Sequence, residues 1–134
     1  MRKMMIRIII LFVAINFVWS GNPYGSSADP EMSQMGMASF YSYECANQPM
    51  ANGKNFDPEK RTAASWFYDL GTVLAVKSID TGLITEVVVT DRGPSKKLVK
   101  KGRVIDLSKR AFQDICALKK GLTSVTITVV NKKE

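Results

Sequence analysis

Short runs of β-type residues separated by turn residues are the strongest constraint on how this chain can fold. Segments 71–78 and 83–90 are rich in β-branched residues, and the Asp80-Thr81-Gly82 turn between them predicts a hairpin. Segment 124–130 alternates apolar and polar residues, which is the clearest strand pattern in the sequence. Val87 to Val89 are consecutive, as expected for a strand covered on both sides. Strands this short predict a small β-barrel or sandwich.

Two short helices are expected within this β framework. Asp57 suits the N-cap of a helix that would run to about residue 66, because the next residue is proline. Ser108 suits the N-cap of a second helix over 109–119, and Gly121 supplies its stop. A first strand is expected over 38–43.

The first 20 residues have the composition of a secretory signal peptide: a basic start, an apolar run over 8–19 and small residues after it. The run is too short to favour a membrane span. Cleavage fits after Ser20 and equally after Ala28, and residues 21–34 are predicted to form a flexible tether. We therefore expect a folded domain over 35–134, exported to the periplasm, the cell wall or the extracellular medium, without stable membrane insertion once the leader is removed.

Charge and composition exclude several function classes. Beyond the leader, 16 basic residues face 12 acidic ones, a net charge of +4. For an exported chain, such mild basicity favours acidic wall polymers or anionic lipid surfaces, and no nucleic-acid partner is expected. The chain has no histidine, which removes Ser-His triads and histidine metal sites, and two cysteines do not make a zinc site. No metal site is therefore expected.

Cys45 and Cys116 are the two cysteines of the chain. Because export leads to an oxidising compartment, a disulfide between them is one interpretation. In the other, Cys116 fills the core as a free thiol, since it shares a predicted helical face with Phe112.

Asp91 is the first candidate for chemistry. It stands where an apolar strand ends in Asp91-Arg92-Gly93-Pro94, and strand ends that open into loops are where rigid scaffolds present reactive groups. The alternative is that Asp91 only caps the turn before Gly93-Pro94. A dense basic stretch follows over 96–103, which suits either a solvated face or an acidic glycan.

Three motifs together resemble the rare lipoprotein A family of bacterial proteins: GMASFYS over 36–42, ANGKNFDPEKRTAAS over 51–65, and Asp91-Arg92-Gly93-Pro94. The resemblance covers about residues 36–130. It implies a mainly β fold, a six-stranded double-psi β-barrel with one or two short helices. It also implies an enzyme without a cofactor, a lytic transglycosylase that cleaves peptidoglycan glycan strands and leaves 1,6-anhydro-muramic acid ends.

The implied reaction needs one carboxyl group. That group first protonates the departing glycosidic oxygen and then accepts a proton from the C6 hydroxyl of muramic acid, which acts as nucleophile. Asp91 occupies the position of the family's catalytic aspartate. Because the role requires a carboxyl group that holds its proton near neutrality, the Arg92 side chain is expected to point away from Asp91 and toward substrate. Tyr41 is the first choice for stacking on a sugar ring, with core packing as the alternative. Other aromatic candidates for the groove are Phe40, Tyr43, Trp66 and Phe67.

The sequence departs from the family pattern at two positions. Members that cut glycan usually carry Glu where this chain has Lys54, and His where it has Ser65. Asp57 matches and is a candidate substrate ligand, with a helix cap as the alternative. Lys54 would contact a lactyl or peptide carboxylate or extend into water. These departures favour an alternative function, a catalytically inactive, expansin-like module that binds cell-wall polysaccharide. Asp106, in the matching Ile-Asp-Leu-Ser motif, is expected to bind backbone amides within the barrel.

Overall fold

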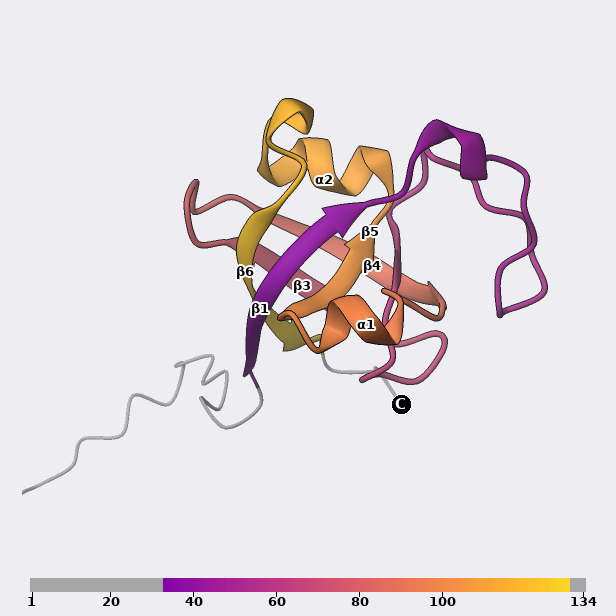
Figure 1. The fold of residues 1–134 in the computed structure, drawn as a ribbon, viewed down its shortest axis with the longest axis horizontal. Coiled ribbons are helices and arrows are strands. Elements are labelled where there is room, and N and C mark those ends of the chain that lie inside the picture. Colours follow the sequence, from indigo (N-terminus) through magenta and orange to yellow (C-terminus); the bar gives the residue numbers. More distant parts are fainter. Residues whose placement is uncertain (1–32, 131–134) are drawn as a thin grey trace, which may run out of the picture.

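A computed structural model describes residues 33–130 as a closed barrel of six strands (Figure 1). The strands are β1 (Ser33–Phe40), β2 (Thr62–Ala64), β3 (Val73–Ser78), β4 (Ile84–Asp91), β5 (Arg103–Leu107) and β6 (Thr123–Val129). Around the barrel they follow the order β1-β5-β2-β4-β3-β6. The β1–β5 and β2–β4 pairs are parallel and the other four are antiparallel. The double-psi β-barrel implied by the resemblance is confirmed.

The two clearest strand predictions are also confirmed. β3 and β4 form the predicted antiparallel hairpin. β6 follows the alternating segment within one residue at each end and pairs with both β1 and β3, which closes the barrel. Val125 and Ile127 on β6 are fully buried, because the apolar face of the alternating pattern points into the core.

The first strand begins earlier than the sequence predicted. β1 starts at Ser33, inside the predicted tether, and ends at Phe40. Its early residues lack an apolar pattern, but pairing with β6, where Ser33 lies opposite Thr128, satisfies their backbone groups. The predicted leader and most of the tether lie outside the described residues. Within 33–130, no helix has the length and apolar character needed to span a membrane.

The helix predicted from Asp57 is wrong. The Asp57 carboxylate accepts a hydrogen bond from the Glu59 amide at 2.9 Å, and the Lys60 amide donates to the Asp57 carbonyl at 3.2 Å, so this segment is a turn. The chain then enters β2, which pairs with β4 on one side and β5 on the other. Two neighbouring strands in the barrel thus outweigh a local signal for a helix.

The second predicted helix is present but shorter. The Ser108 hydroxyl accepts a hydrogen bond from the Ala111 amide at 3.2 Å and caps α2 (Lys109–Ile115). A separate 3-10 turn, η3 (Leu118–Lys120), follows, and Gly121 ends it in the left-handed conformation at φ 68°. The remaining helical segments are α1 (Lys96–Val99) and the 3-10 turn η2 (Tyr43–Cys45). In Figure 1, α1 and α2 lie at opposite sides of the barrel.

Both cysteines are free, so the disulfide interpretation is wrong and the core interpretation of Cys116 is correct. Cys116 belongs to the apolar core together with Phe112, where apolar side chains enclose the thiol. Cys45 is half-buried in η2, among the loop residues that surround Asp91. The two thiols therefore belong to separate parts of the fold.

Candidate active site

Asp91 is the last residue of β4, and the backbone around it fixes its carboxylate. Its Oδ1 atom accepts hydrogen bonds from the Ala51 amide at 3.0 Å and from the Arg92 amide at 2.8 Å. Its carbonyl accepts from the Ser65 amide at 3.1 Å. Within the described residues no ammonium or guanidinium group pairs with this carboxylate. Asp91 is thus oriented by two main-chain amides, and the Tyr41 hydroxyl is its hydrogen-bonding side-chain neighbour.

The Ala51 amide belongs to a small hairpin over residues 47–56, here called the 47–56 hairpin. The Asn47 amide donates to the Phe56 carbonyl, and the Met50 amide to the Lys54 carbonyl, both at 2.8 Å. At its tip the Asn52 amide donates to the Thr90 carbonyl at 3.1 Å, which docks the hairpin onto the end of β4. The amino-acid pattern of residues 47–56 does not indicate this hairpin, because the bonds that order it involve mainly backbone groups.

Tyr41 and Asp91 share a hollow of about 110 Å³. Its other lining residues are Cys45, Gln48, Pro49, Met50 and Phe56. The Tyr41 ring packs edge-on against Phe56, with 5.2 Å between ring centroids. Burial, followed by the negative charges of Asp91 and Asp106, raises the pKa of Tyr41 well above its usual value. Its hydroxyl therefore stays protonated at neutral pH and can donate a hydrogen bond to a neighbouring oxygen.

Asp106 lies near this hollow and binds side chains, so the expectation of backbone amides is wrong. The Ser39 hydroxyl donates to its Oδ1 atom, and Arg103 forms an ion pair with the same oxygen at 3.7 Å. Burial raises the pKa of Asp106, while Ser39 and Arg103 act in the opposite direction. Sequence reasoning missed this arrangement because the register that places Ser39 opposite Asp106 exists only in the closed barrel.

Arg92 points away from Asp91, as expected, but its guanidinium is used within the protein. One terminal nitrogen donates to the Ser65 carbonyl at 2.8 Å and to the Tyr68 carbonyl at 2.6 Å. Arg92 therefore braces the segment that carries Trp66 and Phe67. These two aromatic side chains are 46% and 49% exposed, whereas Phe40 packs against Phe112 in the core.

Trp66 is tied to the loop that follows Asp91. Its indole N–H donates to the Pro94 carbonyl at 2.6 Å, and the Lys96 ammonium lies 5.5 Å from the ring centroid. Tyr43 is another aromatic candidate, and the Lys109 ammonium lies 4.1 Å from the centroid of its ring. An exposed ring fixed beside the Asp91-Arg92-Gly93-Pro94 turn is a suitable platform for the apolar face of a sugar.

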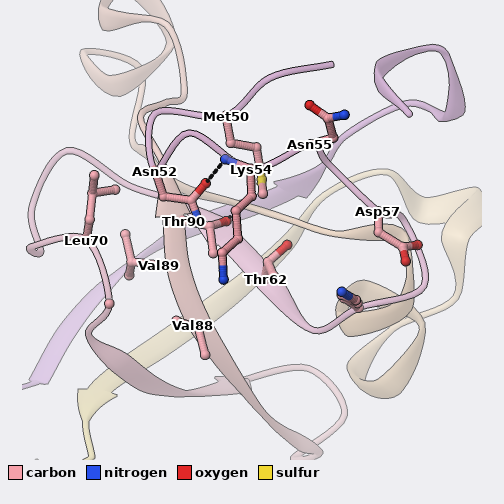
Figure 2. A pocket seen from close by; sticks show the side chains of 12 residues that line it. Met50, Asn52, Lys54, Asn55, Asp57, Thr62, Leu70, Val88, Val89 and Thr90 are labelled. Atoms are coloured by element: carbon pink, nitrogen blue, oxygen red, sulfur yellow. Dashed lines mark hydrogen bonds between the residues drawn. The ribbon is translucent and has the colours of Figure 1, made fainter. Parts of the chain in front are cut away.

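Lys54 and Asp57 line a second and larger hollow of about 560 Å³, here called the lysine pocket (Figure 2). The Lys54 amide donates to the Asn52 side-chain oxygen at 3.0 Å, and Figure 2 shows the Lys54 side chain extending toward Thr62 and Val88. Met50 lines this pocket and the Asp91 hollow alike. The complete lining is Met50, Asn52, Lys54, Asn55, Asp57, Lys60, Thr62, Leu70, Gly71, Val88, Val89 and Thr90.

The structure therefore divides the predicted site residues into separate groups. Tyr41 and Asp91 meet in one hollow, Lys54 and Asp57 line its neighbour, and Arg92 lines neither. Ser65, at the family's histidine position, is buried, and its hydroxyl accepts from the Phe67 amide at 3.1 Å. Within residues 33–130 no three His, Cys, Asp or Glu side chains are placed to hold a metal ion. Proton transfer by a carboxyl group is the chemistry that this arrangement supports.

Comparisons with known sequences agree on one family. A family model described as lytic transglycolase matches residues 33–127. The endolytic peptidoglycan transglycosylase RlpA of Helicobacter pylori is 36% identical over 95 residues, which cover 71% of this chain and 29% of that protein. The protein of the same name from Yersinia pestis is 38% identical over 93 residues, covering 69% of this chain and 25% of that protein. The chain thus spans less than a third of the length of these relatives.

A solved structure with a similar fold belongs to a protein of a different name. An expansin of Clavibacter michiganensis, solved in complex with cellohexaose, matches with a TM-score of 0.58 and 20% identity. The match covers 77% of this chain and 52% of the expansin. At this identity the likeness concerns the barrel alone.

Proposed function

Because the chain belongs to the rare lipoprotein A (RlpA) family, we propose that it is a lytic transglycosylase that cleaves peptidoglycan glycan strands and leaves 1,6-anhydro-muramic acid ends. The observation that carries this proposal is the setting of Asp91. Its carboxylate stands at the end of a barrel strand, is held by two amides, pairs with no cation among residues 33–130 and faces a hollow. Asp91 also occupies the position of the family's catalytic aspartate.

In the proposed reaction, the Asp91 carboxyl group donates its proton to the glycosidic oxygen as the bond from that oxygen to C1 of muramic acid breaks. The C6 hydroxyl oxygen of the same sugar then bonds to C1, and its proton returns to the Asp91 carboxylate. The products are a free hydroxyl on the departing sugar and a 1,6-anhydro ring. Water is not consumed, so a single carboxyl group suffices, and the second carboxylate of a hydrolase is not needed.

Other side chains would position the glycan. The protonated Tyr41 hydroxyl would donate a hydrogen bond to substrate or to the Asp91 carboxylate. Trp66 and Phe67 would stack on sugar rings, and Arg92 would act indirectly by bracing the segment that carries them. Lys54 and Asp57 would contact the same strand from the neighbouring lysine pocket.

The proposed substrate places the protein in the cell envelope. The predicted leader supports export, to the periplasm or the cell wall or beyond it, and the relatives are named for action on peptidoglycan. Export also agrees with the mild basic charge, since wall polymers carry many carboxylates.

A second function, an expansin-like module that binds wall polysaccharide without cutting it, is favoured by one specific observation. The hollow at Asp91 measures about 110 Å³, below the roughly 300–1,000 Å³ typical of ligand pockets. Lys54 and Ser65 also stand where family members that cut glycan usually carry Glu and His, and the barrel is similar to that of an expansin solved with cellohexaose.

The two functions are separated by incubating the purified domain with peptide-free glycan strands and analysing the products by mass spectrometry. Anhydro-muramic ends that require Asp91 are the expected result. If the protein sediments with the glycan but generates no such ends, it is a binding module. If protein that lacks the Asp91 carboxyl group still forms anhydro-muramic ends, the catalytic assignment of Asp91 is overturned.

A further inference from the structure

The lysine pocket holds two cations that no acidic group neutralises. Lys54 and Lys60 both line it, and neither ammonium forms an ion pair within the described residues. Asp57 is the single carboxylate in the lining, and its Oδ1 atom already accepts a hydrogen bond from the Glu59 amide. The lining therefore carries a net positive charge, which suits an anionic ligand.

The remaining lining of the pocket suits a ligand with polar and apolar parts. Asn52 and Asn55 contribute amide groups, and the Asn52 side-chain oxygen is already used by the Lys54 amide. Leu70 and Val88 are partly exposed and provide apolar surface. At about 560 Å³ the pocket falls within the usual range for small-molecule sites. A carboxylate attached to a short carbon skeleton matches this combination better than a bare inorganic anion does.

One hairpin links this pocket to the catalytic carboxylate. The Ala51 amide of the 47–56 hairpin holds Asp91, while Lys54 on the same hairpin reaches into the lysine pocket (Figure 2). Met50 lies between the two hollows, and its sulfur accepts a hydrogen bond from the Thr90 hydroxyl at 3.3 Å. A glycan strand bound across Met50 would place one sugar at Asp91 and the next substituent in the lysine pocket.

We propose that the lysine pocket binds a carboxylate carried by the glycan strand, with Lys54 and Lys60 as its ligands. This inference rests on the proposed function, because it names the part of the same substrate that lies beside the cleaved bond. Two sources share the chemistry. One is the lactyl carboxylate of peptide-free muramic acid, and the other is a carboxylate of the peptide attached there. The pocket would thus select acidic glycan over neutral polymers such as chitin.

The test measures binding with Asp91→Asn protein, so that no probe is consumed. The probes are a peptide-free muramic acid tetrasaccharide, the same compound with its lactyl carboxyl groups converted to methyl amides, and glycan that bears peptides. Calorimetry should show roughly tenfold tighter binding of the acid than of the amide, the scale of one charge-assisted hydrogen bond. The added change Lys54→Gln with Lys60→Gln should remove this difference, and Lys54→Glu should weaken binding of the acid further.

The matched control is Lys119→Gln with Lys120→Gln, which removes the same charge from the exposed η3 turn. It should preserve the preference for the acid. The peptide-bearing probe could bind in a way that depends on Lys54 and Lys60 and is lost when its peptide carboxyl groups are amidated. That result would identify the peptide as the source of the bound carboxylate. Tightest binding of the peptide-free acid would identify the lactyl group.

Equal binding of acid and amide, or a preference that survives removal of both lysines, would overturn the inference. Because both lysines are exposed and lack ion pairs within 33–130, the variants should keep the melting temperature of the parent, which excludes misfolding as the cause. Failure of the proposed function would give a different result. The wild-type protein would then form no anhydro-muramic ends, while binding that depends on Lys54 and Lys60 would persist.

Discussion

Asp91 and Asp114 are carboxylates in two regions of one barrel, and their surroundings are opposite. Asp114 on α2 accepts hydrogen bonds from the Arg61 guanidinium at 2.6 Å and 3.2 Å and from the Thr85 hydroxyl at 2.8 Å. Asp91 accepts main-chain hydrogen bonds at one oxygen and pairs with no cation among residues 33–130. The difference separates a carboxylate that joins elements of the fold from one that lines a hollow.

The charge state of Asp114 shows the same contrast. The hydrogen bond from Arg61, together with Thr85 and the charges of Arg61 and Arg110, lowers the pKa of Asp114. A carboxylate held in this way stays ionised and cannot deliver a proton near neutral pH. Main-chain amides orient Asp91 without adding a full positive charge. Asp114 is thus committed to contacts within the protein, whereas Asp91 faces a hollow and pairs with no cation among residues 33–130.

The largest expected effect is on activity, from Asp91→Asn. The amide oxygen of asparagine can still accept the Ala51 and Arg92 hydrogen bonds, so the melting temperature should change little. Formation of anhydro-muramic ends should fall by about 100-fold or more, the usual contribution of a general acid. Mass spectrometry of digested glycan strands and thermal unfolding measure the two outcomes. A large loss of stability would mean that Asp91 is structural.

The opposite result is expected for Asp114→Ala. Thr85 is 4% exposed, and loss of its acceptor should lower the free energy of unfolding by about 1–2 kcal/mol. Activity at 25 °C should not change, because Asp114 lines neither the Asp91 hollow nor the lysine pocket. Urea unfolding monitors stability, with Glu86→Gln on the exposed face of β4 as the control. Reduced activity in the folded variant would contradict the separation of the two regions.

A smaller effect should appear in the pH dependence of stability, with opposite signs for two aspartates. Asp114 has a lowered pKa in the folded state, so its stabilisation is present above the unfolded pKa and is lost as pH falls through the folded pKa. Asp106 has a raised pKa, so folding binds protons, and stability falls as pH rises from the unfolded pKa through the folded one. Denaturant unfolding of Asp114→Asn should show a weaker loss in acid, and Asp106→Asn a weaker loss toward neutral pH. If both variants show the same dependence of unfolding free energy on pH as the wild type, neither aspartate contributes to stability in the way proposed.

The smallest effect concerns the two free thiols. Because neither is bonded, reductant should leave the melting temperature unchanged. Cys45 is half-buried beside the Asp91 hollow and should react with a thiol reagent in the native protein, whereas Cys116 in the core should react only on unfolding. Mass spectrometry of labelled peptides distinguishes them. A drop in melting temperature with reductant would indicate a disulfide.

Sequence patterns predicted the elements whose signals are local. The β3–β4 hairpin, the alternation of β6 and the Ser108 cap of α2 all follow from neighbours along the chain, and all are present. β2 was missed because its three residues carry no strand pattern strong enough to oppose the helix signal at Asp57. Its identity as a strand depends on β4 and β5, which come later in the sequence.

The site was predictable to the extent that motifs identify residues. Tyr41 and Asp91 were chosen from motifs, and the fold places them in one hollow. The motifs did not indicate that Lys54 would line a separate pocket. Nor could they indicate the Ser39 and Arg103 contacts of Asp106, since barrel closure creates the parallel register between β1 and β5.

The sequence by itself determined that an acid would stand at the end of a β-strand, because an apolar run bounded by Asp91-Arg92-Gly93-Pro94 is the local pattern of a strand that ends there. Only the tertiary structure decided what that acid can do. The Ala51 amide that orients Asp91 lies 40 residues earlier in the chain, and Arg92, its immediate neighbour, turns to carbonyls of the 65–68 segment. A hydrogen bond requires its donor and acceptor to be close in space. Groups far apart in the sequence come that close only when the barrel closes.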